Sequence, residues 1–149
     1  MQLFSQRLQD VLVPVDGSAY GYEALSMACG LTKRNKGKIY AVYVIEVARA
    51  LALDAEMIPE AQKAEEVLAR AEQIGGELDG KVEGEILQAR DAGHAIVDEA
   101  IERGVSAIVL GVGYENPLGE FEMGHTAQYV IQHAPCQVVL LRAAAQESA

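Results

Sequence analysis

The segment Ala107-Ile-Val-Leu-Gly-Val-Gly113 is an apolar run that ends in two glycines, and a helix is predicted to start beyond it, at Gly124-His125-Thr126. The apolar run has the composition of a strand that is buried on both faces. A strand that leads through a glycine-containing loop into a helix brings bare backbone N–H groups and the positive end of the helix dipole together. This stretch therefore predicts an α/β unit with an anion-binding site at the end of the strand.

The same order of strand and helix repeats along the chain. Short apolar or β-branched runs predict strands over 11–15, 39–45, 82–87, 107–110 and 137–141. Helical spacing predicts four helices: one that follows Asp16-Gly17-Ser18, one over about 57–78, one that carries Ile96, Val97, Ala100 and Ile101 and stops at Gly104, and one over 126–133. This alternation indicates βαβ units, hence an open five-stranded parallel sheet with helices on both faces, a Rossmann-like α/β fold. The more polar third strand is predicted at an edge.

Composition limits the classes of protein and of partner. The chain has 149 residues, of which 50% are apolar, and a net charge of −10. We expect a single domain over 1–149 with a disordered tail over about 143–149. The negative charge argues against nucleic acid or an anionic membrane surface as a partner, and no apolar run is long enough for membrane insertion. Cys29 and Cys136 lie outside any pairing or metal-binding motif, so we expect free thiols in the cytoplasm.

In an open α/β sheet, ligands bind beyond the carboxyl ends of the strands, which here are Asp16, Glu46, Gly111 and Arg142. Asp16 closes the first strand and precedes Gly17-Ser18. It has two interpretations, which stay open here: a cap at the entry to a helix, or a carboxylate that accepts a hydrogen bond from a ligand hydroxyl. Residues 47–59, rich in Ala and Leu, are interpreted as a mobile cover near the second strand.

Four segments together resemble the universal stress protein family: Val11-Leu-Val-Pro-Val-Asp-Gly-Ser18, Val42-Tyr-Val-Ile45, Ile108-Val-Leu-Gly111 and Val130-Ile-Gln-His-Ala-Pro-Cys-Gln-Val138. The resemblance implies the strand order 3-2-1-4-5 and a homodimer that pairs through its last strand. Some members of that family bind ATP, with the adenine at the ends of the first and second strands. By this resemblance Val15, Asp16 and Val44 would contact the base and the ribose.

The resemblance also implies a phosphate-binding pattern of glycines, which this chain matches in part. Gly111 and Gly124 match the first and third glycines, whereas Tyr114 replaces the second and His125 replaces the Ser or Thr that follows the third. Gly113 and Thr126 are the candidates to take over these two roles. A tyrosine side chain blocks the close approach to the backbone that a glycine permits.

The charged residues of the predicted loop further limit how many phosphoryl groups a bound nucleotide can carry. No Lys or Arg occurs between Arg103 and Arg142, whereas Glu115, Glu120 and Glu122 fill the predicted loop. Carboxylates repel a triphosphate unless Mg²⁺ bridges them. AMP or a related adenylate therefore suits the site better than ATP with Mg²⁺. Arg90, after the third strand, is expected as an exposed loop residue rather than as an anion ligand.

These observations predict a regulatory dimer with a degenerate adenine-nucleotide site. Two alternatives stay open: a ligand-free protein-interaction module of the stress response, and a weak ATP-binding or nucleotide-hydrolysing member. Catalysis is not expected, because His125 and Asp16 form the only plausible pair and a nucleophile motif is absent. A metal site at His125, His133 and Cys136 is not expected either. The dimer edge would consist of the apolar last-strand residues Val138, Val139, Leu140 and Leu141.

Overall fold

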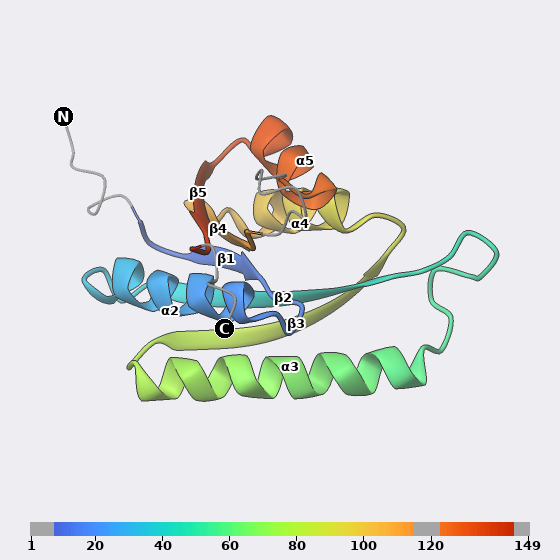
Figure 1. Ribbon diagram of the computed structural model, residues 1–149, viewed down its shortest axis with the longest axis horizontal. Helices are drawn as coiled ribbons and strands as arrows, with labels where there is room; N and C mark the ends of the chain where they lie inside the picture. The colour runs from blue at the N-terminus through green and yellow to red at the C-terminus, as the bar shows by residue number, and fades with distance from the viewer. Residues whose placement is uncertain (1–7, 115–122, 145–149) are drawn as a thin grey trace.

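The computed structural model describes residues 8–114 and 123–144, and these form a parallel sheet covered by helices (Figure 1). The strands are β1 (Val11–Pro14), β2 (Lys38–Glu46), β3 (Lys81–Ala89), β4 (Ala107–Val112) and β5 (Gln137–Arg142). The helices are α2 (Ala19–Lys33), α3 (Ile58–Glu77), α4 (Ala92–Arg103) and α5 (His125–His133). The five strands are parallel and lie in the order β3-β2-β1-β4-β5, so the predicted fold class and strand order are confirmed.

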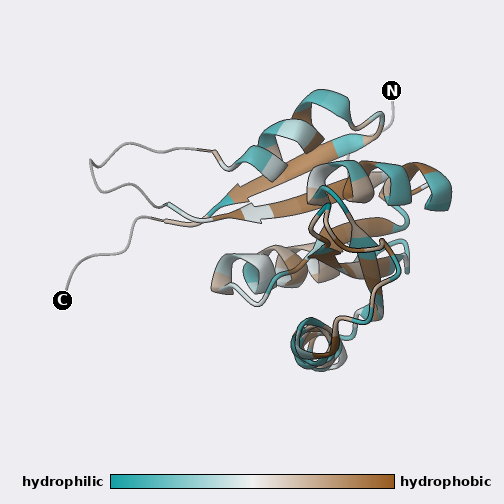
Figure 2. Cartoon of the chain, turned by 90° about the vertical axis from the view of Figure 1, so that its right-hand side faces the viewer, coloured by the Kyte–Doolittle hydropathy of each residue, from teal (hydrophilic) through white to brown (hydrophobic). Residues whose placement is uncertain are grey.

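β1 is the central strand, between β2 and β4. Val11 pairs with Ile39 on one side and with Ala107 on the other. Its successive side chains point to opposite faces of the sheet, and the exposed fraction of Val11, Leu12 and Val13 is 0%. Figure 2 shows strands coloured mostly as hydrophobic between helices that carry both hydrophilic and hydrophobic residues. A strand that is apolar on both faces is stable only when helices cover both, which explains the continuous apolar run Val11–Val13.

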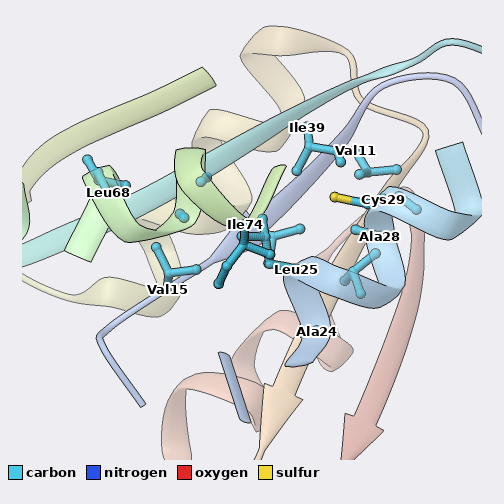
Figure 3. Packing of buried hydrophobic residues seen from close by; sticks show 14 of the residues in the cluster. Val11, Val15, Ala24, Leu25, Ala28, Cys29, Ile39, Leu68 and Ile74 are labelled. Atoms are coloured by element: carbon cyan, nitrogen blue, oxygen red, sulfur yellow. The ribbon is translucent and has the colours of Figure 1, made fainter. Parts of the chain in front are cut away.

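Helices α2 and α3 cover one face of the sheet (Figure 1). α2 packs mainly on β1 and β4 and α3 on β2 and β3, and their apolar stripes join Val11, Val13 and Ile39 in one cluster, part of which Figure 3 shows. The buried apolar residues of the two helices follow a spacing of three or four: Ala24, Leu25, Ala28 and Cys29 on α2, and Ala64, Val67, Leu68, Ala71 and Ile74 on α3. Burial of each large apolar side chain contributes about 1.5–3 kcal/mol, so this interface provides a large share of the stability.

Helices α4 and α5 cover the opposite face, on Leu12, Val42 and Ile108. α4 ends where predicted, at Gly104, whose φ of 64° is left-handed and favours glycine. All four residues predicted on this helix belong to α4: Ile96, Val97 and Ala100 are buried, and Ile101 is 56% exposed. Ile101 follows Ala100 directly, and one step of about 100° around the helix carries it away from the sheet.

The two edges of the sheet are β3 and β5. β3 is longer than the predicted 82–87 because it pairs with β2 along its whole length, from Lys38–Lys81 to Glu46–Ala89. The segment interpreted as a mobile cover is tied to β3. Gln88 Nε2 donates to the carbonyls of Leu53 and Ala55, at 2.9 and 3.1 Å. Beyond β5, the N–H of Ala143 donates to Val112 O at 2.8 Å, and residues 145–149 of the predicted tail lie outside the described residues.

Candidate functional site

A cavity of about 310 Å³ opens at the carboxyl ends of β1, β2 and β4, on the face covered by α4 and α5. Its inner part is apolar, because Val42, Val44 and Leu110 from the strands and Ile96 from α4 line it. Polar residues and two glycines from the strand ends and the starts of α2 and α5 continue the lining: Asp16, Ser18, Tyr20, Gly21, Glu46, Gly124 and Thr126. The remaining lining residues are Pro14, Val15, Ala92, Gly111, Val112 and Ala127. An apolar cavity with a few polar groups at its mouth is typical of a small-molecule site.

The structure brings most of the predicted site residues to this cavity. Those that line it are Val15, Asp16, Val44, Gly111, Gly124 and Thr126. Gly113 and His125 are described but do not line it. His125 is an exposed residue at the start of α5, so the predicted pair of His125 and Asp16 does not meet in the cavity.

Asp16 takes part in the entry to α2. Its Oδ1 accepts a hydrogen bond from the N–H of Ser18 at 2.9 Å, and Ser18 Oγ caps the helix by accepting from the N–H of Gly21 at 3.3 Å. Gly17 between them has a φ of 96°, a conformation that an L side chain rarely adopts. The helix-entry interpretation of Asp16 is thus confirmed, while its ligand-binding interpretation stays a prediction.

The first turns of α4 and α5 differ in how their N–H groups are satisfied. Asp91 Oδ1 accepts from the N–H groups of Gly93 and His94, at 2.8 and 3.4 Å. Glu46 Oε2 accepts from the N–H of Ala92 at 3.2 Å. α5 begins at Gly124, whose position carries no side-chain cap. Of the helix starts that line the cavity, α5 is therefore the one whose N–H groups are available for an anion.

Gly111 has a packing role that does not depend on a ligand. A Cβ at this position would overlap the backbone carbonyl of Tyr20, and Ala24 Cβ lies 3.2 Å away. Its lack of a side chain therefore lets β4 approach the first turn of α2. The nearby Tyr114, which occupies the position of a glycine in the family pattern, has its ring 4.8 Å from the guanidinium of Arg142. Tyr114 does not line the cavity.

The described lining carries negative charge. Asp16 and Glu46 are its charged residues, and within that lining neither Lys nor Arg occurs. Arg90 lies elsewhere: its Nη1 donates to the carbonyls of Val47 and Ala48, at 3.3 and 2.6 Å, and holds the loop after β2. Glu115, Glu120 and Glu122, on which the predicted repulsion of a triphosphate also rests, lie outside the described residues.

The site residues predicted from the sequence did not include three polar residues of the lining, Ser18, Tyr20 and Glu46, although Glu46 was placed at the carboxyl end of a strand. Tyr20 belongs to the first turn of α2, and nothing in the sequence indicates which side of that turn faces the ligand crevice. For Glu46, the alternation of residues along β2 indicates that its side chain faces the cavity. Val42, Val44 and Glu46 alternate along β2, so their side chains share one face of the strand, with Glu46 at its carboxyl end.

The described part of the chain has neither a metal-ligating cluster nor a membrane-spanning helix. Within residues 8–114 and 123–144, no three His, Cys, Asp or Glu residues are grouped so as to hold a metal ion. Over the same residues, no helix combines the length and apolarity that crossing a bilayer requires. Cys29 and Cys136 are free, and burial raises the pKa of both thiols.

The sheet order, the helices on both faces and the crevice at the strand ends define a doubly wound α/β protein with a small-molecule cavity. The model of the universal stress protein family matches residues 8–142, and the chain therefore belongs to the universal stress protein family. It is similar to universal stress protein MJ0531 of Methanocaldococcus jannaschii, with 30% identity over 138 residues that cover 89% of this chain and 81% of that protein.

Solved structures share the fold. The universal stress protein from Archaeoglobus fulgidus in complex with dAMP superposes with a TM-score of 0.72 at 22% identity, over 89% of this chain and 96% of the other. A universal stress protein family protein from Arabidopsis thaliana with AMP bound superposes with a TM-score of 0.69 at 18% identity, over 92% of this chain and 93% of the other. At these identities the likeness shows the fold of this chain and not its ligand.

Proposed function

We propose that this chain is a nucleotide-binding regulatory protein whose cavity takes an adenylate with a single phosphoryl group, such as AMP. The observation that carries the proposal is the polarity of the cavity: an apolar interior, a carboxylate rim and one helix start without a side-chain cap. Its volume of about 310 Å³ lies within the range of small-molecule sites. The AMP and dAMP complexes of proteins with the same fold support this choice.

The base occupies the apolar interior. Val42 and Val44 on the sheet and Ile96 on α4 line it, which provides apolar surface for a flat heterocycle. Asp16 lies at the rim at the end of β1, where its carboxylate accepts hydrogen bonds from the ribose hydroxyls. In this proposal Val15, Asp16 and Val44 contact the base and the ribose, as the family resemblance implies.

The phosphoryl group binds at the start of α5, where Gly124 and Thr126 line the cavity. The N–H groups of the first turn and the Thr126 hydroxyl donate to it, and the helix dipole favours its charge. Further phosphoryl groups would lack cationic partners among the described lining residues. AMP is therefore preferred over ATP, and ATP would need Mg²⁺ as a counter-ion.

The regulatory unit is a homodimer that pairs through β5. This strand is an edge of the sheet, and Val138, Val139, Leu140 and Leu141 are all partly exposed along it. Antiparallel pairing with the same strand of a second copy would satisfy its edge N–H and C=O groups and cover these side chains. The two free thiols support the cytoplasm as the location of this dimer.

A second candidate function is a dimer that acts through protein contacts alone. Gly111 is explained by its packing against Tyr20, and Asp16 and Ser18 by the entry to α2. These residues of the family pattern would therefore be retained without a nucleotide. Isothermal titration separates the two candidates.

The deciding experiment titrates the purified protein with AMP, adenosine, and ATP with and without Mg²⁺. We expect saturable AMP binding with a Kd on the order of micromolar, and ATP without Mg²⁺ weaker by about tenfold or more. Adenosine measures the contribution of the phosphoryl group. Mass analysis of small molecules released by denaturing the protein checks for a nucleotide already bound. Absence of binding by every adenylate would refute nucleotide binding and leave the protein-contact function.

A further inference from the structure

Glu46 lies at the mouth of the cavity in a fixed orientation. It follows Val42 and Val44 on the same face of β2, and all three line the cavity. One carboxylate oxygen, Oε2, accepts the N–H of Ala92 at 3.2 Å, which holds the side chain across the gap between β2 and α4. The residue is nevertheless exposed, so the carboxylate is open to a bound molecule.

The cavity has two ends of opposite polarity. At the β2 end, Glu46 provides a carboxylate, with Asp16 beyond the adjacent β1, and Asp91 together with Glu46 already satisfies the first N–H groups of α4. At the other end, the start of α5 offers N–H groups without a side-chain cap. β1 separates β2 from β4, so the ends of β2 and β4 lie about 10 Å apart. This spacing is comparable to the length of a nucleoside monophosphate, so the two ends act on different parts of one ligand.

We infer that Glu46 determines where on the nucleoside a phosphoryl group is accepted. The inference rests on the proposed nucleotide function. Its carboxylate accepts hydrogen bonds from free ribose hydroxyls and repels a phosphoryl group on the 2′ or 3′ oxygen. An acid at the end of a strand plays the same part in dinucleotide-binding folds, where it accepts the ribose hydroxyl and disfavours a 2′-phosphate. The substrate class of this site is therefore a nucleoside 5′-phosphate with free ribose hydroxyls.

The test compares two isomers with the same base and the same charge, 5′-AMP and 3′-AMP, by isothermal titration. The wild-type protein should prefer 5′-AMP by about tenfold or more, since like charges a few ångströms apart at a partly solvated site cost about that factor. Glu46→Gln should shift the ratio of the two dissociation constants by about tenfold in favour of 3′-AMP, because it removes the repulsion, while 5′-AMP binding should weaken through the lost charge-assisted hydrogen bond. Glutamine keeps an oxygen that accepts the N–H of Ala92, so α4 stays in place.

Asp98→Asn is the matched control. Asp98 is an exposed residue of α4 outside the cavity lining, and its substitution changes the net charge by the same amount. It should leave the ratio of the two dissociation constants unchanged. The effect of Glu46→Gln on this ratio should also shrink as salt rises from about 0.05 to 0.5 M, because salt screens charge repulsion. A purely structural role would not show this salt dependence.

The outcomes separate the two proposals. If wild-type protein binds 5′-AMP but Glu46→Gln leaves the isomer ratio unchanged, or weakens both isomers equally, the role of Glu46 is disproved and the nucleotide function stands. If wild-type protein binds neither isomer, the nucleotide function fails, and the inference about Glu46 fails with it.

Discussion

Gly111 of β4 packs so closely on the backbone carbonyl of Tyr20 that a single methyl group at position 111 would overlap it. This contact fixes the distance between β4 and the first turn of α2, two elements that both line the cavity. The overlap involves backbone on the Tyr20 side, which cannot move aside as the end of a flexible side chain could.

Gly111→Ala should therefore destabilise the protein. We expect the free energy of unfolding to fall by about 1–3 kcal/mol, the usual cost of an overpacked site, as measured by urea denaturation. Gly30→Ala is the control, because Gly30 is an exposed residue of α2 with open space around it. That change should raise the free energy of unfolding by about 0.5–1 kcal/mol. Equal stability of Gly111→Ala and wild type would contradict the packing role.

Substitutions at Asp16 and at His125 should affect AMP affinity to different extents. Asp16→Asn removes the charge that is proposed to hold the ribose but keeps an oxygen that can accept the N–H of Ser18. AMP affinity should fall by about tenfold, as expected for loss of a charge-assisted hydrogen bond. His125→Ala should change the affinity by less than about twofold, because His125 lies outside the cavity lining. Titration calorimetry measures the AMP affinity of both variants. A larger loss of affinity for His125→Ala than for Asp16→Asn would show that the ligand binds outside this cavity.

The dimer prediction can be tested at Leu141. Leu141 is a partly exposed residue of the edge strand β5, so Leu141→Asp would bring two like charges into the proposed interface. We expect a dimer for wild type and a monomer for this variant by size-exclusion chromatography with light scattering. Ile101→Asp, at a 56% exposed position on α4, should remain dimeric. A monomeric wild type would rule out the pairing.

The cap of α4 should make stability depend on pH. Burial alone would raise the pKa of the Asp91 carboxyl, but hydrogen bonds from His94 and Gly93 and the charge of His94 lower it below its ordinary value. A lowered folded-state pKa means that the ionised carboxylate stabilises the fold fully above the unfolded value of about 3.9, and that this contribution is lost as pH falls through the folded pKa.

Asp91→Asn should thus lower the free energy of unfolding by about 0.5–1 kcal/mol at pH 6. The difference should shrink as pH falls below about 3.9 and through the lowered folded-state pKa, because the wild-type carboxyl becomes protonated over that range. Urea denaturation over a pH series from about 6 to about 2 measures it. A difference that stays the same size down to the lowest pH would show that the charge of Asp91 is not what stabilises α4.

The sequence was sufficient for the fold because the strands and helices carry strong and different periodicities. The run Val11–Val13 could only be a strand covered on both faces, and Gly104 marks the end of α4. The sequence does not indicate that Ile101 is exposed while Ile96, Val97 and Ala100 are buried, because the orientation of α4 on the sheet decides this. Likewise, the extent of β3 depends on its pairing with β2 rather than on its own composition.

The site was only partly predictable. Asp16, Gly111 and Gly124 follow from the rule that ligands bind at the carboxyl ends of parallel strands. The rule does not tell which residues of the helix starts turn towards the crevice, so Tyr20 was missed and His125 was included. The partners of Arg90 could not be predicted from the sequence either. Only the structure shows that its guanidinium donates hydrogen bonds to the carbonyls of Val47 and Ala48.

Hydrogen bonds from β3 and from Arg90, which follows it, hold the segment after β2, next to one wall of the cavity. Gln88 and Arg90 together hold four carbonyl groups of that segment, and the N–H of Val47 donates to Ala89 O at 2.8 Å. The wall that carries Val44 and Glu46 is therefore braced just beyond its end. A molecule that enters the crevice therefore meets a β2 wall whose position is held by β3 through these hydrogen bonds.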